Sequence, residues 1–123
     1  EPAVPYADDY DTCVKEAKAL IGRASIKEIL TYISAYDTIF EMSPIYWGTF
    51  APEVETALSG LDFAGKTIRV VSTHEGSGLG RMVSDVRKLC PGANVDGNAL
   101  AVQGCRAKQS KEIVARWLMT QDE

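Results

Sequence analysis

The stretch Tyr36–Gly48 places a strand directly before a loop of large aromatic side chains. Residues 37–42 are rich in strand-forming types, and we expect Pro44 to end the strand because proline cannot donate to a ladder of hydrogen bonds. The residues Ile45–Trp47 then put apolar side chains where a loop normally carries polar ones. Ligands of open α/β sheets bind outside the carboxyl ends of the strands, so this loop favours a flat ring as the ligand.

Segments with strand character alternate with segments with helix character along the rest of the chain. Strands are expected near residues 37–43, 66–73 and 93–102, and helices near 8–22, 51–60, 79–89 and 110–120. We expect Asp96-Gly97 to interrupt the third strand. A helix follows each strand, which indicates parallel βαβ units in an α/β fold. No internal repeat or linker is found, so residues 1–123 are expected to form a single domain.

The first helix carries one apolar face. Its apolar residues recur at spacings of three and four; they are Tyr10, Cys13, Val14, Ala17, Leu20 and Ile21. Asp8 or Asp9 can cap its start, and Gly22 is a reasonable stop.

Composition excludes several classes of function. The formal net charge of −4 argues against a nucleic-acid or anionic-membrane partner. No apolar run approaches the roughly 20 residues of a membrane span, and no signal peptide is recognised, so we expect a cytoplasmic protein. The cysteines Cys13, Cys90 and Cys105 have neither disulfide nor zinc-site spacing, which favours reduced, buried thiols and no metal.

A glycine-rich segment, Gly76–Gly80, follows the second expected strand and opens the next helix. Its backbone N–H groups can approach an anion or the edge of a ring. The spacing is not the dinucleotide fingerprint and the lysine of a P-loop is missing, so a simple tight turn is the alternative interpretation. Together, an aromatic and a glycine-rich loop on neighbouring strands can clasp a planar ligand.

Four blocks of this sequence resemble the flavodoxins. They are Tyr36–Phe40, Pro44–Thr49, Asp62–Ile68 and Gly76–Gly80, in the family's order and spacing. The resemblance covers about residues 5–117, and the nearest group is the bacterial flavodoxin-like proteins with a Pro-Ile-Trp-Trp-Gly loop. It implies a flavodoxin-like three-layer sandwich, FMN as cofactor, and electron transfer or flavin reduction with a redox partner protein or a nicotinamide donor.

The resemblance also implies where the flavin ring lies. The first wall would be Pro44, Ile45, Tyr46, Trp47 and Gly48, and the second Thr73, His74, Glu75, Gly76, Ser77 and Gly78. Trp47 or Tyr46 would lie against the ring. His74, the only histidine, could hydrogen-bond a ring atom or tune the flavin's charge, although a structural role in the loop is the alternative. No catalytic acid–base or nucleophile constellation is found.

The start of the chain departs from the family pattern. A flavodoxin begins with a strand, a phosphate-binding loop, a helix and a second strand, and we expect this chain to lack them. The domain would then be truncated. Losing several charge-assisted hydrogen bonds, at roughly 1.5–3 kcal/mol each, would weaken FMN binding by orders of magnitude.

The family's strand order makes the expected strands three contiguous neighbours. The helices 8–22, 51–60 and 79–89 would share one face of the sheet and leave the other to helix 110–120 alone. Glu41 and Arg69 would then stand on a partly bare face, or form an incidental pair.

In this arrangement the strand at 37–42 is an open edge, and we expect a homodimer or a second chain along Asp37–Met42. The alternative function is therefore a truncated, flavin-free module that binds a partner or dimerises through this edge.

Overall fold

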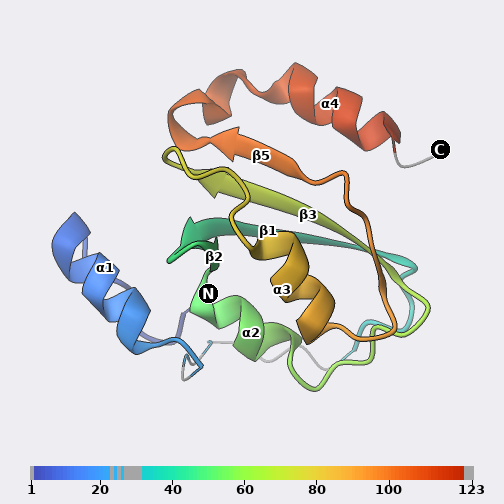
Figure 1. The fold of residues 1–123 in the computed structure, drawn as a ribbon, viewed down its shortest axis with the longest axis horizontal. Helices are drawn as coiled ribbons and strands as arrows, with labels where there is room; N and C mark the ends of the chain where they lie inside the picture. The colour runs from blue at the N-terminus through green and yellow to red at the C-terminus, as the bar shows by residue number, and fades with distance from the viewer. Residues whose placement is uncertain (1, 23, 25, 27–31, 121–123) are drawn as a thin grey trace.

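The computed structural model describes residues 2–22, 24, 26 and 32–120, which form a mostly parallel sheet with helices on both faces (Figure 1). The elements are α1 (Tyr10–Ala19), β1 (Thr38–Tyr46), β2 (Thr49–Phe50), α2 (Pro52–Leu58), β3 (Thr67–His74), α3 (Met82–Leu89), β4 (Asn94–Val95), β5 (Leu100–Gln103), η1 (Gly104–Gln109) and α4 (Lys111–Met119). Within these described residues, no helix is both long enough and apolar enough for a membrane crossing.

The central strand β3 pairs in parallel with β1 on one side and with β4 and β5 on the other. Thr38 lies opposite Thr67 and Pro44 opposite Thr73, so the two longest strands end together. The third predicted strand is indeed interrupted: β4 ends at Val95 and β5 begins at Leu100. The contiguous, parallel arrangement confirms the predicted α/β fold class.

The prediction that Pro44 ends its strand is wrong. β1 continues to Tyr46, and its last two residues turn back into β2 through the antiparallel pairs Ile45–Phe50 and Tyr46–Thr49. Among the described residues, β3 is the only strand paired with β1 at Pro44. The missing N–H of proline can therefore face outward from the edge without removing a ladder bond.

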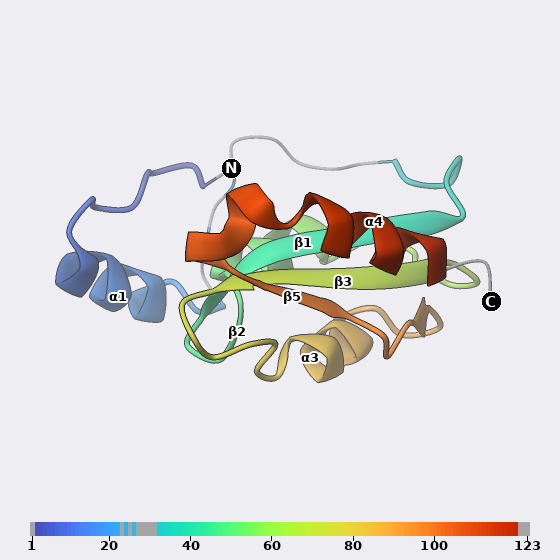
Figure 2. The ribbon, with the colours of Figure 1, turned by 90° about the horizontal axis from the view of Figure 1, so that it is seen from above.

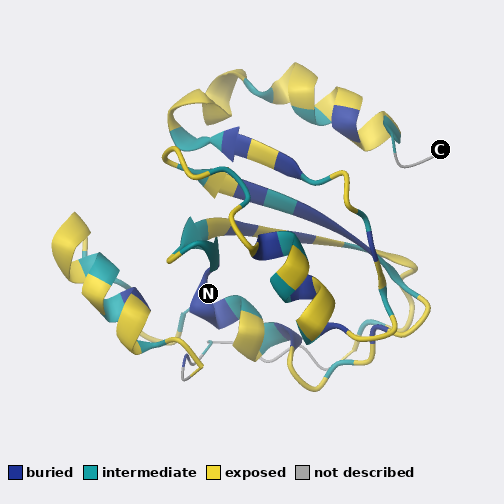
Figure 3. Ribbon diagram, viewed as in Figure 1, coloured by how far each residue is buried: buried dark blue, intermediate teal, exposed yellow. Residues whose placement is uncertain are grey.

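The main core lies between the sheet and the helices α2 and α3 (Figures 1 and 3). Its buried side chains come from β2, β3, β4, both helices and their connections; they are Phe50, Leu58, Phe63, Ile68, Val70, Met82, Val86, Cys90 and Val95. A smaller core of Leu100, Val102 and Trp117 joins β5 to α4 on the opposite face. The predicted third layer is thus a single helix.

The first helix does not join α2 and α3 on the sheet, which corrects the expected placement of residues 8–22. α1 lies beyond the carboxyl ends of the strands (Figures 1 and 2). Ala17 is its one buried residue, whereas Tyr10 is 79% exposed. The sheet face is already filled by α2 and α3, so the apolar side of α1 meets the loops at the strand ends instead.

Glu41 and Arg69 neither pair with each other nor stand on a bare face. Strand alternation points them to opposite sides, because Arg69 lies opposite Phe40 and Glu41 opposite Val70. Both are buried, Glu41 in the face covered by α2 and α3 and Arg69 beneath Trp117 of α4.

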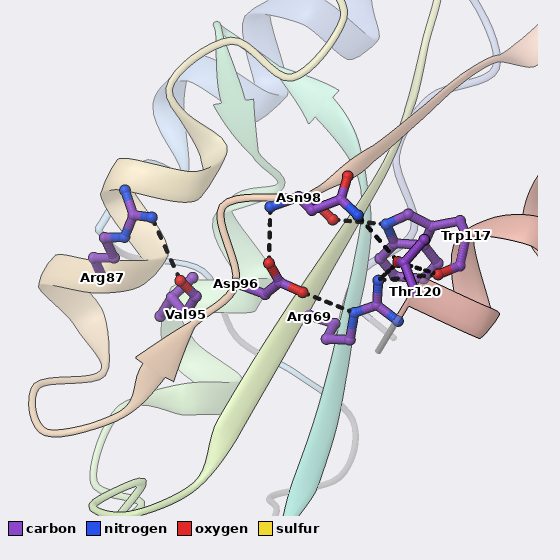
Figure 4. Close-up of polar contacts among 7 residues, drawn as sticks. All are labelled: Arg69, Arg87, Val95, Asp96, Asn98, Trp117 and Thr120. Atoms are coloured by element: carbon purple, nitrogen blue, oxygen red, sulfur yellow. Dashed lines mark hydrogen bonds and ion pairs between the residues drawn. The ribbon is translucent and has the colours of Figure 1, made fainter. Parts of the chain in front are cut away.

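Arg69 fastens α4 to the sheet (Figure 4). Its Nη2 donates to the Trp117 carbonyl at 3.1 Å and to the Thr120 hydroxyl at 3.0 Å, and its guanidinium carbon lies 3.8 Å from the Trp117 ring centroid. Asp96 pairs with its Nε at 3.2 Å. The predicted partly bare face does exist, but Phe40 and Met42 of β1 form it, with Met42 69% exposed.

All three cysteines are free thiols, yet the expectation that they are all buried is wrong. Cys90 is buried in the main core, Cys13 is half-buried on α1, and Cys105 is exposed on η1.

Candidate functional site

A cavity of about 580 Å³ opens at the carboxyl ends of β1 and β3. Its walls come from α1, from the end of β1 and the turn after it, from the end of β3 and the loop after it, and from the start of η1. The lining residues are Tyr10, Cys13, Val14, Ala17, Pro44, Ile45, Tyr46, Trp47, Gly48, Thr73, His74, Glu75, Ser77 and Gly104. The two loops predicted to form a single site therefore lie at the same end of the molecule and face one space.

The aromatic loop is a two-residue hairpin turn formed by Trp47 and Gly48. Their φ angles are 54° and 82°, and two positive angles define the turn type whose twist suits a β-hairpin. This left-handed conformation costs about 1–2 kcal/mol of conformational free energy at Trp47. Arg81 holds the turn in place: its backbone N–H donates to the Gly48 carbonyl at 2.7 Å and its Nη2 to the Trp47 carbonyl at 3.3 Å.

The Trp47 side chain stays outside the core, 45% exposed, and contacts α1. Its Nε1–H donates to the carbonyl oxygen of Val14 at 2.9 Å, and the Lys18 ammonium lies 4.8 Å from the ring centroid. These contacts place α1 across the opening, where Cys13 and Val14 complete the wall.

Tyr46 gives the first wall a fixed aromatic surface. The ring of Tyr6 meets it edge-on with centroids 5.5 Å apart, and the Tyr6 hydroxyl donates to Oε1 of Glu53 at 2.7 Å. Burial, followed by the hydrogen bond to Glu53, raises the pKa of Tyr6 above its usual range. Burial also raises the pKa of Tyr46, with a smaller contribution from Cys13. Both phenols therefore remain neutral at ordinary pH.

The second wall is held by hydrogen bonds within the loop after β3. The Ser72 hydroxyl donates to the Gly78 carbonyl at 2.8 Å, and the Gly76 N–H donates to Nδ1 of His74 at 3.0 Å. Glu75 extends toward η1, where a Cβ on Gly104 would lie 2.5 Å from its Oε1. Glycine at position 104 thus leaves room for the carboxylate.

The structure brings most of the predicted site residues together. Pro44, Ile45, Tyr46, Trp47, Gly48, Thr73, His74, Glu75 and Ser77 line one cavity, while Gly76 and Gly78 shape the loop without lining it. Sequence reasoning missed Gly104 and the α1 residues. The signal for α1 was present in its apolar spacing, but we interpreted that stripe as packing on the sheet.

The lining suits a flat, largely apolar ring with a few polar groups at its edge. Glu75 is the one acidic residue among the described residues that line the cavity, and neither lysine nor arginine lines it. The residues present therefore fit the ring of a flavin, while the cavity offers no cationic side chain to its phosphate.

The parallel sheet, its layers of helices and the cavity at the strand ends define a flavodoxin-like flavoprotein fold. A model of the flavodoxin family matches residues 1–121, and this chain belongs to the flavodoxin family. No curated protein matches the sequence significantly.

Solved structures show the same fold at low sequence identity. A protein assigned as a flavoprotein from Bacteroides eggerthii is 24% identical with a TM-score of 0.74, over 97% of this chain and 76% of that one. A similar protein from Bacteroides uniformis is 22% identical with a TM-score of 0.73, over 94% and 78%. A Lactobacillus acidophilus flavoprotein in complex with FMN is 22% identical with a TM-score of 0.57, over 85% and 71%.

Proposed function

We propose that this chain binds FMN, with the isoalloxazine ring in the cavity between the aromatic loop Pro44–Gly48 and the loop Thr73–Gly78. In this role it is an electron carrier or a flavin-dependent reductase that exchanges electrons with a redox partner protein or a nicotinamide donor. We place it in the cytoplasm, where the thiols of its three free cysteines stay reduced.

The observation that carries the proposal is the shared cavity. Two loops distant in sequence face each other at the strand ends, where ligands of open α/β sheets bind. One loop presents Tyr46 and a half-exposed Trp47, and the other presents His74 and hydroxyl groups. Family membership and the FMN found in the Lactobacillus acidophilus protein point to the same cofactor.

The bound flavin would supply the redox chemistry. The residues of this chain would bind and orient the ring and exclude water from it. Tyr46 and Trp47 offer apolar surface to the ring, and α1 covers the opening from outside. His74, Thr73 and Ser77 offer polar groups at the edge of the cavity.

Titration with FMN, followed by the quenching of flavin fluorescence, tests the proposal. Trp47→Ala should weaken binding at least tenfold, because it removes the aromatic wall together with the contact to α1. Tyr36→Ala is the matched control, since Tyr36 is also an exposed aromatic residue, at 60%, and does not line the cavity. Unchanged flavin fluorescence in the presence of excess parent protein would contradict the proposal.

The second candidate is a flavin-free module that binds a partner or a second copy of itself through β1. The exposed Phe40 and Met42 beside the outer edge of this strand favour it. A colourless protein that ignores added FMN and yet forms a stable dimer would support this function over flavin binding.

A further inference from the structure

We propose that His74 donates a hydrogen bond from Nε2 to an acceptor atom on the edge of the flavin ring. This inference rests on the proposed function, because it assigns one residue a defined role at the same site. It goes further because it assigns the imidazole nitrogen that makes the hydrogen bond, and identifies that nitrogen as the donor.

The tautomer follows from a hydrogen bond inside the loop. The backbone N–H of Gly76 donates to Nδ1 of His74 at 3.0 Å. Nδ1 must therefore be an acceptor, and a neutral imidazole with an acceptor at Nδ1 carries its proton at Nε2. The hydrogen bond from Gly76 thus selects one tautomer of His74, in which Nε2 is the N–H donor.

The strand fixes where the backbone of His74 lies relative to the cavity. His74 is the last residue of β3 and lies opposite Gln103 of β5, so ladder pairing fixes its backbone. His74 lines the cavity together with Thr73 and Ser77. Gly76 has a φ of 153°, which L side chains rarely adopt, and this conformation accompanies the return of its N–H toward His74.

The ligand provides the complementary group. The pyrimidine edge of an isoalloxazine exposes carbonyl oxygens and ring nitrogens that accept hydrogen bonds, and it has a single N–H donor. An Nε2–H donor can therefore hydrogen-bond to most of the polar atoms on that edge. The apolar walls around Trp47 and Tyr46 also reduce the competition from water for this bond.

The first test needs no flavin. His74 is the chain's only histidine, so nitrogen–proton correlation spectra of the ¹⁵N-labelled protein contain one imidazole. At alkaline pH, where an ordinary imidazole is neutral, the spectrum should show the tautomer protonated at Nε2. Added FMN should shift the Nε2 resonance more than the Nδ1 resonance. A dominant tautomer protonated at Nδ1, or an Nε2 resonance that does not respond to bound FMN, would overturn the inference.

The second test uses two substitutions that each keep one end of the ring. His74→Gln places an amide N–H near the position of Nε2, whereas His74→Asn keeps a polar group near Nδ1 and removes the donor. The Gln variant should bind FMN within about threefold of the parent, and the Asn variant about five- to tenfold more weakly.

The outcomes separate this inference from the proposed function. A loss of affinity confined to the Gln variant would show that His74 acts through the turn, because only that variant lacks the acceptor near Nδ1. Equal affinity in the two variants, reduced or not, would show that Nε2 makes no bond to the flavin. Either result overturns the inference and leaves flavin binding intact. Failure of the parent protein to bind FMN would overturn the proposed function and this inference with it.

Discussion

Gly80 lies where the two loops of the cavity come together. A Cβ at this position would be 2.8 Å from the Gly48 carbonyl carbon and closer still to its oxygen, and the φ of Gly80 is 51°. Gly78, two residues earlier, has a similar φ of 66° but open space around it. Alanine substitutions at these two glycines therefore distinguish the cost of a steric clash from the cost of an unfavourable backbone conformation.

Gly80→Ala should destabilise the protein by about 1–3 kcal/mol more than Gly78→Ala does, because only the first forces the aromatic loop to move. Gly78→Ala should cost about 1–2 kcal/mol, from its positive φ alone. Denaturation by urea measures both. Equal losses of unfolding free energy in the two variants would show that Gly80 and the aromatic loop are not in tight contact.

Glu41 is an acid in an apolar setting. Its side chain is in the main core, and neither carboxylate oxygen has a hydrogen-bond partner among the described residues. Burial raises its pKa from 4.5 to about 7. Burial, followed by the charge of Glu41, also raises the pKa of the Cys90 thiol to about 11, so that thiol is protonated at neutral pH.

The free energy of unfolding should fall as pH rises from about 4.5 to about 7. In that window the folded chain holds a proton on Glu41 that the unfolded chain has released, and the total loss is about 3 kcal/mol. Glu41→Gln should remove this dependence and be more stable than the parent at pH 8. Denaturation at several pH values checks this, with the exposed Glu112→Gln as control. A similar slope in the Gln variant would contradict it.

At the scale of elements, α1 begins at a side-chain cap and contacts the site at Trp47. The Asp9 carboxylate accepts the Thr12 N–H at 2.8 Å, and this bond lowers the pKa of Asp9. The helix in turn presents the Val14 carbonyl to the indole of Trp47.

Asp9→Ala should destabilise α1, because it removes the side-chain cap of the helix. Hydrogen exchange at the Trp47 indole N–H should then become faster, because the bond to Val14 opens with the helix. Asp8→Ala, one residue earlier, is the matched control and should leave the exchange rate unchanged. Similar rates in all three proteins would show that α1 is not held by this cap.

Local sequence patterns predicted where helices and strands lie along the chain better than how these elements pack in space. Pro52 at the start of α2, the interruption after Val95 and the cap at Asp9 follow from single-residue chemistry, so the sequence shows them. The hairpin at Trp47-Gly48 was missed because tryptophan rarely adopts a positive φ. The position of α1 could not be predicted, because an apolar stripe shows that a helix packs without showing against what.

The same limit applies to the site. The two loops could be paired from sequence because parallel strands end at one edge of a sheet. Glu41 and Arg69 were misplaced because their opposite orientations depend on the register of β1 against β3, which pattern alone does not give.

At the scale of the whole molecule, the outer edge of β1 is largely unpaired among the described residues. Within the described residues its outer edge pairs only with the two residues of β2, and Phe40 and Met42 lie exposed beside it. An unpaired edge next to apolar side chains favours association.

We expect a dimer or a complex along the predicted edge Asp37–Met42. Met42→Lys should lower the dimer fraction at micromolar concentration in light scattering, because it places a charge in the interface. Met119→Lys is the control, since Met119 is 76% exposed and lies at the end of α4, outside β1. A monodisperse parent monomer would contradict the expectation.

The bonds from Arg81 to Trp47 and Gly48 have a consequence for what the cavity can admit. They join the aromatic loop to the segment that follows the glycine-rich loop, whereas α1 contacts the aromatic loop through the Trp47 indole and the Lys18 ammonium. We therefore expect a thicker or thinner ligand to be accommodated by a shift of α1, so that the range of modified flavins that bind would depend on how far this helix can move.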